Sequence, residues 1–127
     1  GFSRSYRLRH VNTGRVLSIE RIEERRDRRL WTLCLDDEFE EQGPGTKSQF
    51  AIYNTHISPD GHLQDGSVIK MKSLHKSGGY VNASGRSWSN LRFLESKFQR
   101  NVSLESFEGS ASPSKLKMKF FEEAISY

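Results

Sequence analysis

Apolar and polar residues alternate in short runs along the chain, and this period of two predicts β-strands. The first run is "YRLRH", which starts at Tyr6, breaks at a turn containing Gly14 and resumes at Val16. Such runs are rich in β-forming residues, and Gly, Asn, Asp, Pro and Ser separate them. We therefore predict an all-β chain with strands near residues 5–11, 15–20, 30–36, 49–54, 67–74, 79–83, 91–96 and 115–121.

One stretch fits a second pattern as well. In "SIERIEERRDRRL", the residues Ile19, Ile22 and Leu30 and the opposite charges four residues apart are typical of a helical turn. A long charged hairpin loop fits the same residues. Both alternatives stay open for this stretch.

The apolar positions of the predicted strands define a core. Side chains on one face of a half-buried strand point toward the interior, so every second apolar residue is expected to be buried. The predicted core residues are Leu8, Leu17, Leu33, Leu35, Phe50, Ile52, Ile69, Met71, Val81, Leu91, Phe93 and Leu116.

The strand pattern occurs twice in the same order, over residues 5–56 and 66–122. The run "YRLR" is answered by "IKMK", "NTGRVLS" by "KSGGYVNAS", "LWTLCL" by "LRFLES", and "SQFAIYNT" by "SKLKMKFFEE". Each copy predicts four short strands. Gly14, and Gly78 with Gly79, can supply the positive φ that a tight hairpin turn needs.

A recurring four-stranded unit that is too small to bury its own face predicts a β-trefoil. That fold is built from three such units, and only two are found here. We expect one domain over residues 1–127 with the third unit outside this chain. A two-copy β-sandwich is the alternative.

Composition narrows the function classes. The chain has 127 residues, a net charge of +4 and one cysteine, so it is the size of one small domain and forms no internal disulfide. Cys34 lies in "LWTLCL", which predicts a buried, inert thiol suited to a reducing compartment. Residues 1–35 hold nine arginines and four acids, whereas residues 36–65 hold seven acids and one lysine. Because acids interrupt the basic stretches, we expect no nucleic-acid partner.

No catalytic or metal constellation is predicted. His56 and His62 flank "ISPDG" at irregular spacing, which is typical of a polar turn. His10 and His75 are expected to take equivalent structural places after the first strand of each copy. The sequence shows neither a Ser-His-Asp nor a Cys-His arrangement. We expect no enzyme activity, no metal and no cofactor.

In "YRLRHVNTGRVLSIE" and "GSVIKMKSLHKSGGYVNAS" the chain resembles the MIR repeat, a β-trefoil element. This repeat is shared by inositol trisphosphate receptors, ryanodine receptors, protein O-mannosyltransferases and small luminal MIR proteins. The resemblance to the receptor branch is closer, and it rests on the strand "FAI" at Phe50, on the restart "DGS" at Asp65, and on the residues Leu8, Arg9, His10, Thr13, Gly14, Val16 and Leu17.

The resemblance implies a non-catalytic scaffold and interaction domain in the cytosolic N-terminal assembly of an intracellular calcium-release channel. The implied place is the cytoplasmic face of the endoplasmic reticulum, with other domains or subunits of the channel as partners. In that family, the ligand-holding basic residues lie mainly on a preceding repeat and on a helical domain, here beyond Tyr127. An inositol phosphate would therefore bind only together with flanking domains, and no direct membrane span is expected.

Two other functions stay open. A luminal MIR module of an O-mannosyltransferase or folding factor would use the glycosylation sequons at Asn82 and Asn101. A trefoil lectin or actin-bundling module would need repeated exposed aromatic residues. Trp31 is predicted to be in the core and Trp88 to lie exposed in a loop, and one exposed tryptophan does not make a repeated lectin site.

Arg15 and Arg86, beside the two glycine turns, are the candidate ligand-binding residues. A turn backbone and an arginine together can form an anion nest. The other basic residues of the matched strands are expected to point outward separately, without converging on one ring; they are Arg7, Arg9, Lys70 and Lys72. We therefore predict that this chain alone does not bind inositol trisphosphate tightly.

Overall fold

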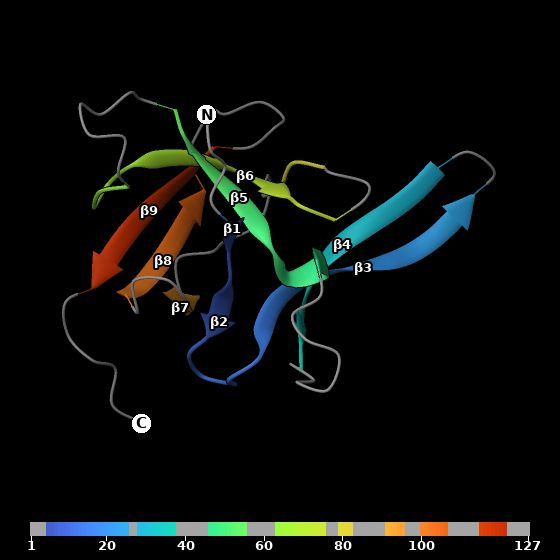
Figure 1. The fold of residues 1–127 in the computed structure, drawn as a ribbon, viewed down its shortest axis with the longest axis horizontal. Coiled ribbons are helices and arrows are strands. Elements are labelled where there is room, and N and C mark those ends of the chain that lie inside the picture. Colours follow the sequence, from blue (N-terminus) through green and yellow to red (C-terminus); the bar gives the residue numbers. More distant parts are fainter. Residues whose placement is uncertain are drawn as a thin grey trace.

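The computed structural model describes residues 5–25, 28–37, 46–55, 63–75, 79–82, 91–95, 100–106 and 115–121, with the backbone alone over residues 21–25 and 28–30. These residues form an all-β structure with one antiparallel sheet of nine strands (Figure 1). The strands are β1 (Ser5–Tyr6), β2 (Leu8–His10), β3 (Val16–Arg25), β4 (Arg28–Asp36), β5 (Phe50–Asn54), β6 (Val68–Ser73), β7 (Arg92–Glu95), β8 (Arg100–Ser106) and β9 (Leu116–Phe121). A 3₁₀ turn, η2 (Thr46–Ser48), precedes β5.

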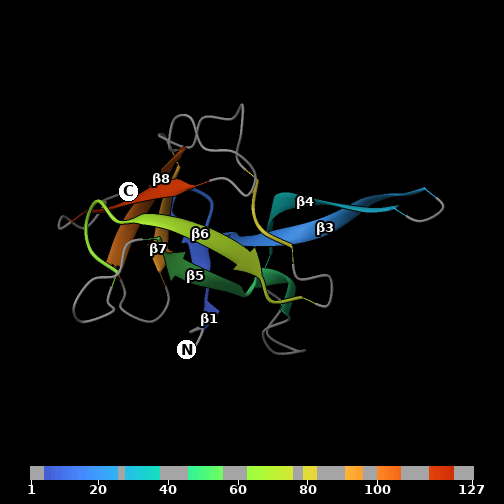
Figure 2. The same cartoon turned by 90° about the horizontal axis from the view of Figure 1, so that it is seen from above.

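The sheet curls round on itself. Its strand order is β1-β5-β6-β9-β8-β7-β2-β3-β4, so β1 and β2 stand far apart in the order although Arg7 alone separates them in the chain. β1 pairs with β5, whereas β2 pairs with β3 and β7. The stretch of sheet from β1 to β2 must therefore roll up until its two ends meet (Figures 1 and 2).

The core lies on the inner face of this rolled sheet. Buried residues alternate along the strands, as in β6, where Ile69, Met71 and Ser73 are buried and the residues between them are not. The twelve predicted core residues all belong to one hydrophobic cluster or pack against it, which confirms the prediction. Leu33, Leu35, Ile52 and Leu91 are only partly buried. Trp31 also packs against the cluster, as predicted.

The undecided charged stretch is a β-hairpin. β3 continues to Arg25 and β4 begins at Arg28, and a register shift between Arg21 and Glu23 marks an irregularity in their pairing. The alternative of a helical turn is therefore wrong for the described part of this stretch. The hairpin projects from the rest of the sheet as a long arm (Figures 1 and 2).

Two strand pairings of the first predicted copy recur in the second copy in the same register. In the first copy Tyr6 lies opposite Phe50, and in the second copy the matching Ile69 lies opposite Leu116. The first hairpin shows the same agreement, because Arg9 lies opposite Val16 and the matching Lys72 bridges to Tyr80. At these two pairings, the matched segments of the two copies have equivalent partners.

The second copy departs from the first in its remaining strands. The strand predicted near residues 79–83 is reduced to the single bridge at Tyr80, and β8 was not predicted. β9 lies between β6 and β8, while β7 closes onto β2 of the first copy. Within the described residues, the copies therefore share the pairing of their first hairpin and the pairing between their first and last strands. They do not share a full set of four strands.

Candidate functional site at the first hairpin turn

The candidate site is the turn between β2 and β3, which carries the residues of the sequence motif. The N–H of Gly14 donates to the carbonyl of His10 at 2.8 Å, and the N–H of His10 donates to the carbonyl of Arg15 at 2.7 Å. Gly14 has a φ of 72°, which a residue with a side chain rarely adopts. The glycine is thus required by the turn, as the sequence predicted.

His10 and Thr13 hold the turn from inside. His10 is buried, and its Nδ1 and the Thr13 hydroxyl oxygen share a hydrogen bond of 2.9 Å. The same hydroxyl oxygen accepts from the backbone N–H of Arg15 at 3.2 Å. The His10 ring packs edge-on against Phe93, with centroids 5.8 Å apart. These motif residues therefore build the hairpin and fix it to β7.

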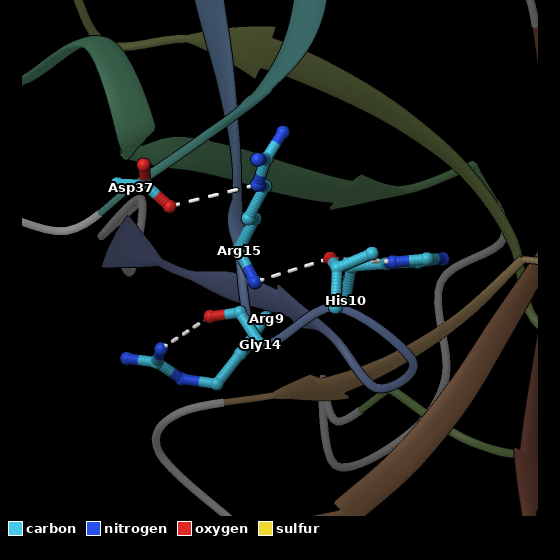
Figure 3. Close-up of polar contacts among 6 residues, drawn as sticks. Arg9, His10, Gly14, Arg15 and Asp37 are labelled. Atoms are coloured by element: carbon cyan, nitrogen blue, oxygen red, sulfur yellow. Dashed lines mark hydrogen bonds and ion pairs between the residues drawn. The ribbon is translucent and has the colours of Figure 1, made fainter.

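Two arginines at this turn, Arg9 and Arg15, are exposed, and Figure 3 shows their contacts. Arg9 donates from Nη1 to the carbonyl of Gly14 at 2.6 Å. The Arg15 Nε lies 3.5 Å from Oδ1 of Asp37, which follows β4. Both side chains of this ion pair are more than half exposed, at 54% and 66%, so solvent screens it strongly.

The folded turn is less suited to binding an anion than the sequence suggested. Two backbone N–H groups of the turn, those of Gly14 and Arg15, already donate within the turn, and a carboxylate stands beside the Arg15 guanidinium. An anion at this turn would have to compete with Asp37. Arg86, the other candidate, lies outside the described residues.

We expect Arg15→Gln to change the free energy of unfolding by no more than about 1 kcal/mol, because an exposed ion pair contributes little. We also expect the chain to bind inositol trisphosphate more weakly than about 1 µM, roughly −8 kcal/mol, since the cations of the turn do not converge. Urea unfolding measures the change in the free energy of unfolding, and isothermal titration calorimetry measures the affinity for inositol trisphosphate. Micromolar or tighter binding that Arg15→Gln removes would contradict the second expectation.

Cys34 is not arranged as a nucleophile. Burial raises the pKa of its thiol, and the nearby carboxylates of Glu20 and Asp36 raise that pKa further. A hydrogen bond with Ser18 and the charge of Lys47 oppose this shift. The thiol is thus protonated at neutral pH. Cys34 is only half-buried, so the prediction of a buried thiol is wrong.

The expected result for Cys34 is slower alkylation by iodoacetamide at pH 8 in the folded chain than in the urea-unfolded chain. The unfolded thiol ionises near its ordinary pKa of 9.0, whereas the folded thiol stays protonated to higher pH. This stabilisation of the folded state is complete below pH 9.0 and is lost as the pH rises through the folded pKa. Mass spectrometry at a series of pH values gives both rates, and equal rates would contradict the prediction.

The histidines do not take equivalent places in the two copies, so that prediction is wrong. The N–H of Ser73 donates to the carbonyl of Gly79 as the N–H of His10 does to Arg15, which makes Ser73 the partner position of His10. His75 lies two residues further, where its Nδ1 meets the Thr46 hydroxyl at 2.8 Å and its ring contacts Trp31. The two histidines nevertheless both make structural contacts.

No group of three or more metal-ligating side chains occurs among the described residues. His56 and His62 lie outside them, as do Gly78 and Trp88. Asp65 accepts from the backbone N–H of Phe120 at 2.9 Å, which ties the turn before β6 to β9. Within the described part of the chain, no helix is long and apolar enough to cross a membrane.

Sequence reasoning missed one surface feature, which lies away from this turn. Tyr53 and Tyr80 are the large hydrophobic residues that remain exposed among the described ones, at 40% and 48%. Their rings lie 6.5 Å apart, and the Lys72 ammonium stands over the Tyr80 ring. The outward positions of these residues follow from strand alternation, but their meeting depends on which strands are neighbours.

No family model matches this chain, and no curated protein or solved structure gives a significant match to it. The resemblance to MIR repeats therefore rests on the motif residues of the sequence alone.

Proposed function

We propose that the chain is a non-catalytic scaffold and interaction module of the β-trefoil type, built from MIR-like repeats. Its proposed place is the cytosolic N-terminal assembly of an intracellular calcium-release channel, in which other domains or subunits are its partners. The proposal extends to the cytoplasmic face of the endoplasmic reticulum. In this proposal, an inositol phosphate binds only with the help of flanking domains, and nucleic acid is not a partner.

The observation that carries the proposal is the shared register of the two copies. The pairs Tyr6 with Phe50 and Ile69 with Leu116 occupy corresponding positions, and so do the first hairpins. A β-trefoil is built from repeated units whose strands pair in the same register. The curled sheet supports that proposal, because it joins strands from both copies in one continuous antiparallel sheet.

The motif residues support a scaffold role over a catalytic one. Leu8, His10, Val16 and Leu17 are buried, and Gly14 supplies the positive φ of the turn. Each of these residues has a structural task, so the resemblance needs no bound ligand or reaction to explain it. The protonated thiol of Cys34 agrees with this reading.

A topology experiment on the native full-length protein tests the proposed place. Sealed endoplasmic-reticulum vesicles are treated with protease, and an antibody against this segment reports whether it is digested. We expect digestion without detergent, and no change in mass after glycosidase treatment.

Protection from protease together with glycans on Asn82 or Asn101 would overturn the cytosolic assignment and support a luminal module. The flanking sequence provides a second test. We expect a third repeat before this segment, a helical region after it and a distant transmembrane bundle, and a full-length protein without such a bundle would contradict the channel assignment.

A further inference from the structure

The two central strands of one side of the rolled sheet carry lysines on their outer face. In β6, Ile69, Met71 and Ser73 are buried, so the intervening Lys70 and Lys72 belong to the opposite face. In β9, Leu116 and Met118 are buried, and Lys117 and Lys119 alternate with them. The lysine positions of both strands are partly exposed.

Strand pairing brings these lysines together. β6 pairs with β9, with Val68 opposite Lys117 and Ile69 opposite Leu116. Lys70 and Lys117 are thus diagonal neighbours, about 7 to 8 Å apart in such a ladder. The strand order thus gathers the lysines of β6 and β9 on one surface, which we call the basic wall.

Two tyrosines complete the basic wall at β6. Tyr53 lies opposite Lys70 on β5, and Tyr80 bridges to Lys72 from the other side of β6. Because their rings are 6.5 Å apart, the tyrosines meet across β6. Exposed tyrosines are common anchors in protein interfaces, since they bury apolar area and keep a hydroxyl for hydrogen bonding.

The strands that form the basic wall supply few carboxylates to its lysines. None of the strands β5, β6 and β9 contains an acidic residue, and the diagonal neighbours Lys70 and Lys117 carry like charges. The acidic residue of β8 is Glu105, which lies opposite Lys117 in the ladder and forms an ion pair with Lys119 at 3.2 Å. Lys70 and Lys72 of β6 have no carboxylate on the paired strands β5 and β9. Lysines that are grouped on one face repel each other, and an anionic partner would relieve this repulsion. The grouping therefore indicates such a partner.

The geometry of the tyrosines decides which anionic partner fits. Single-stranded nucleic acid binds by stacking bases on open aromatic faces. Here the two rings are tilted by 51° against each other, and the Lys72 ammonium lies 5.6 Å from the centroid of the Tyr80 ring. One ring face is thus occupied by a cation, and the pair offers no flat platform for successive bases.

An extended polypeptide matches the spacing of the wall. Lys70 and Lys72 lie two residues apart on one strand, as do Lys117 and Lys119, and that spacing is about 6.5 to 7 Å. A partner strand with a carboxylate at every second residue repeats at the same distance. Its acidic side chains would therefore lie opposite the lysines at the same spacing.

We propose that the basic wall of β6 and β9, with Tyr53 and Tyr80, binds an extended acidic protein segment that carries Asp or Glu at alternate residues. The inference deepens the proposed function, because it gives the interaction module a surface and a class of partner. It does not depend on the cellular compartment, so the topology experiment and the binding experiment can fail separately.

The test measures fluorescence anisotropy of a labelled peptide of about 12 residues that alternates Glu and Thr, long enough to cross the wall. A block peptide of the same composition is the probe control. We expect the alternating peptide to bind more tightly than the block peptide, and its affinity to fall as salt is raised, because exposed charges are screened.

The variant Lys70→Gln/Lys117→Gln removes two charges from the wall, and Lys47→Gln/Arg100→Gln removes two exposed charges elsewhere. We expect the wall variant to weaken binding by about 3- to 30-fold and the control by less than about 2-fold. Tyr80→Ala is expected to weaken binding while leaving its salt dependence unchanged. Thermal melts of each variant separate a folding defect from a binding defect.

Three results would overturn the proposal. These are no binding of the alternating peptide at low salt, an equal loss in the wall and control variants, and tighter binding of an oligothymidine of matched charge than of the peptide. The last result would assign the wall to single-stranded nucleic acid. Preference for the alternating peptide, lost in the wall variant alone, would support the proposal.

Discussion

Replacing Phe93 by alanine is expected to lower the free energy of unfolding by about 3 to 5 kcal/mol. Phe93 is 1% exposed and lies in β7 between His10 of β2 and Val102 of β8. Its ring also supports the buried His10 ring of the candidate turn. Alanine would leave a cavity where three strands meet, and urea unfolding followed by tryptophan fluorescence measures the loss.

Leu33→Ala is the matched comparison for Phe93→Ala. Leu33 packs against the core but is only partly buried, so its replacement is expected to cost less than about 2 kcal/mol. The difference between the two variants reports burial, because both remove apolar side chains from predicted strands. Near-neutral outcomes at both positions would show that the register of the strands is wrong.

The second large effect is expected for Leu104→Ala, which should lower the free energy of unfolding by about 2 to 5 kcal/mol. Leu104 is fully buried at 0% exposure and lies opposite Met118 of β9. It belongs to β8, the strand that sequence reasoning did not predict. The variant therefore tests whether β8 is part of the core.

Glu105→Ala provides the control on the same strand. The Glu105 side chain is 34% exposed and pairs with Lys119, so we expect a change of no more than about 1 kcal/mol. Both variants are measured by urea unfolding with the slope compared to that of the parent chain. Equal small changes at Leu104 and Glu105 would contradict the placement of β8.

The sequence determined the strands whose apolar residues alternate clearly. β6 is the plainest case, because apolar and charged residues alternate from Ile69 to Lys72 and the structure buries Ile69 and Met71 as predicted. The first hairpin was also readable, since Gly14 takes the positive φ that its place in the turn required. Local chemistry is sufficient at such positions, because the period of a strand and the φ of a glycine depend on near neighbours alone.

The sequence did not reveal strands with little apolar signal. β8 reads "RNVSLES", in which Val102 and Leu104 are its apolar residues, yet Ser103 is also buried at 2%. A serine is neutral in a pattern of apolar and polar residues, so its burial depends on the strands around it. The charged residues after Ile19 were ambiguous for a similar reason, and pairing between β3 and β4 made them a hairpin.

Which strands became neighbours was decided by the tertiary structure. The sequence placed Gly14 beside Arg15 and suggested an anion nest, but the folded turn uses the N–H groups of both residues and sets Asp37 against the guanidinium. Conversely, Lys70 and Lys117 belong to distant segments and became one surface because β6 pairs with β9. Alternation along a strand dictates which face a side chain takes, whereas the partner on that face is set by long-range pairing that no local pattern records.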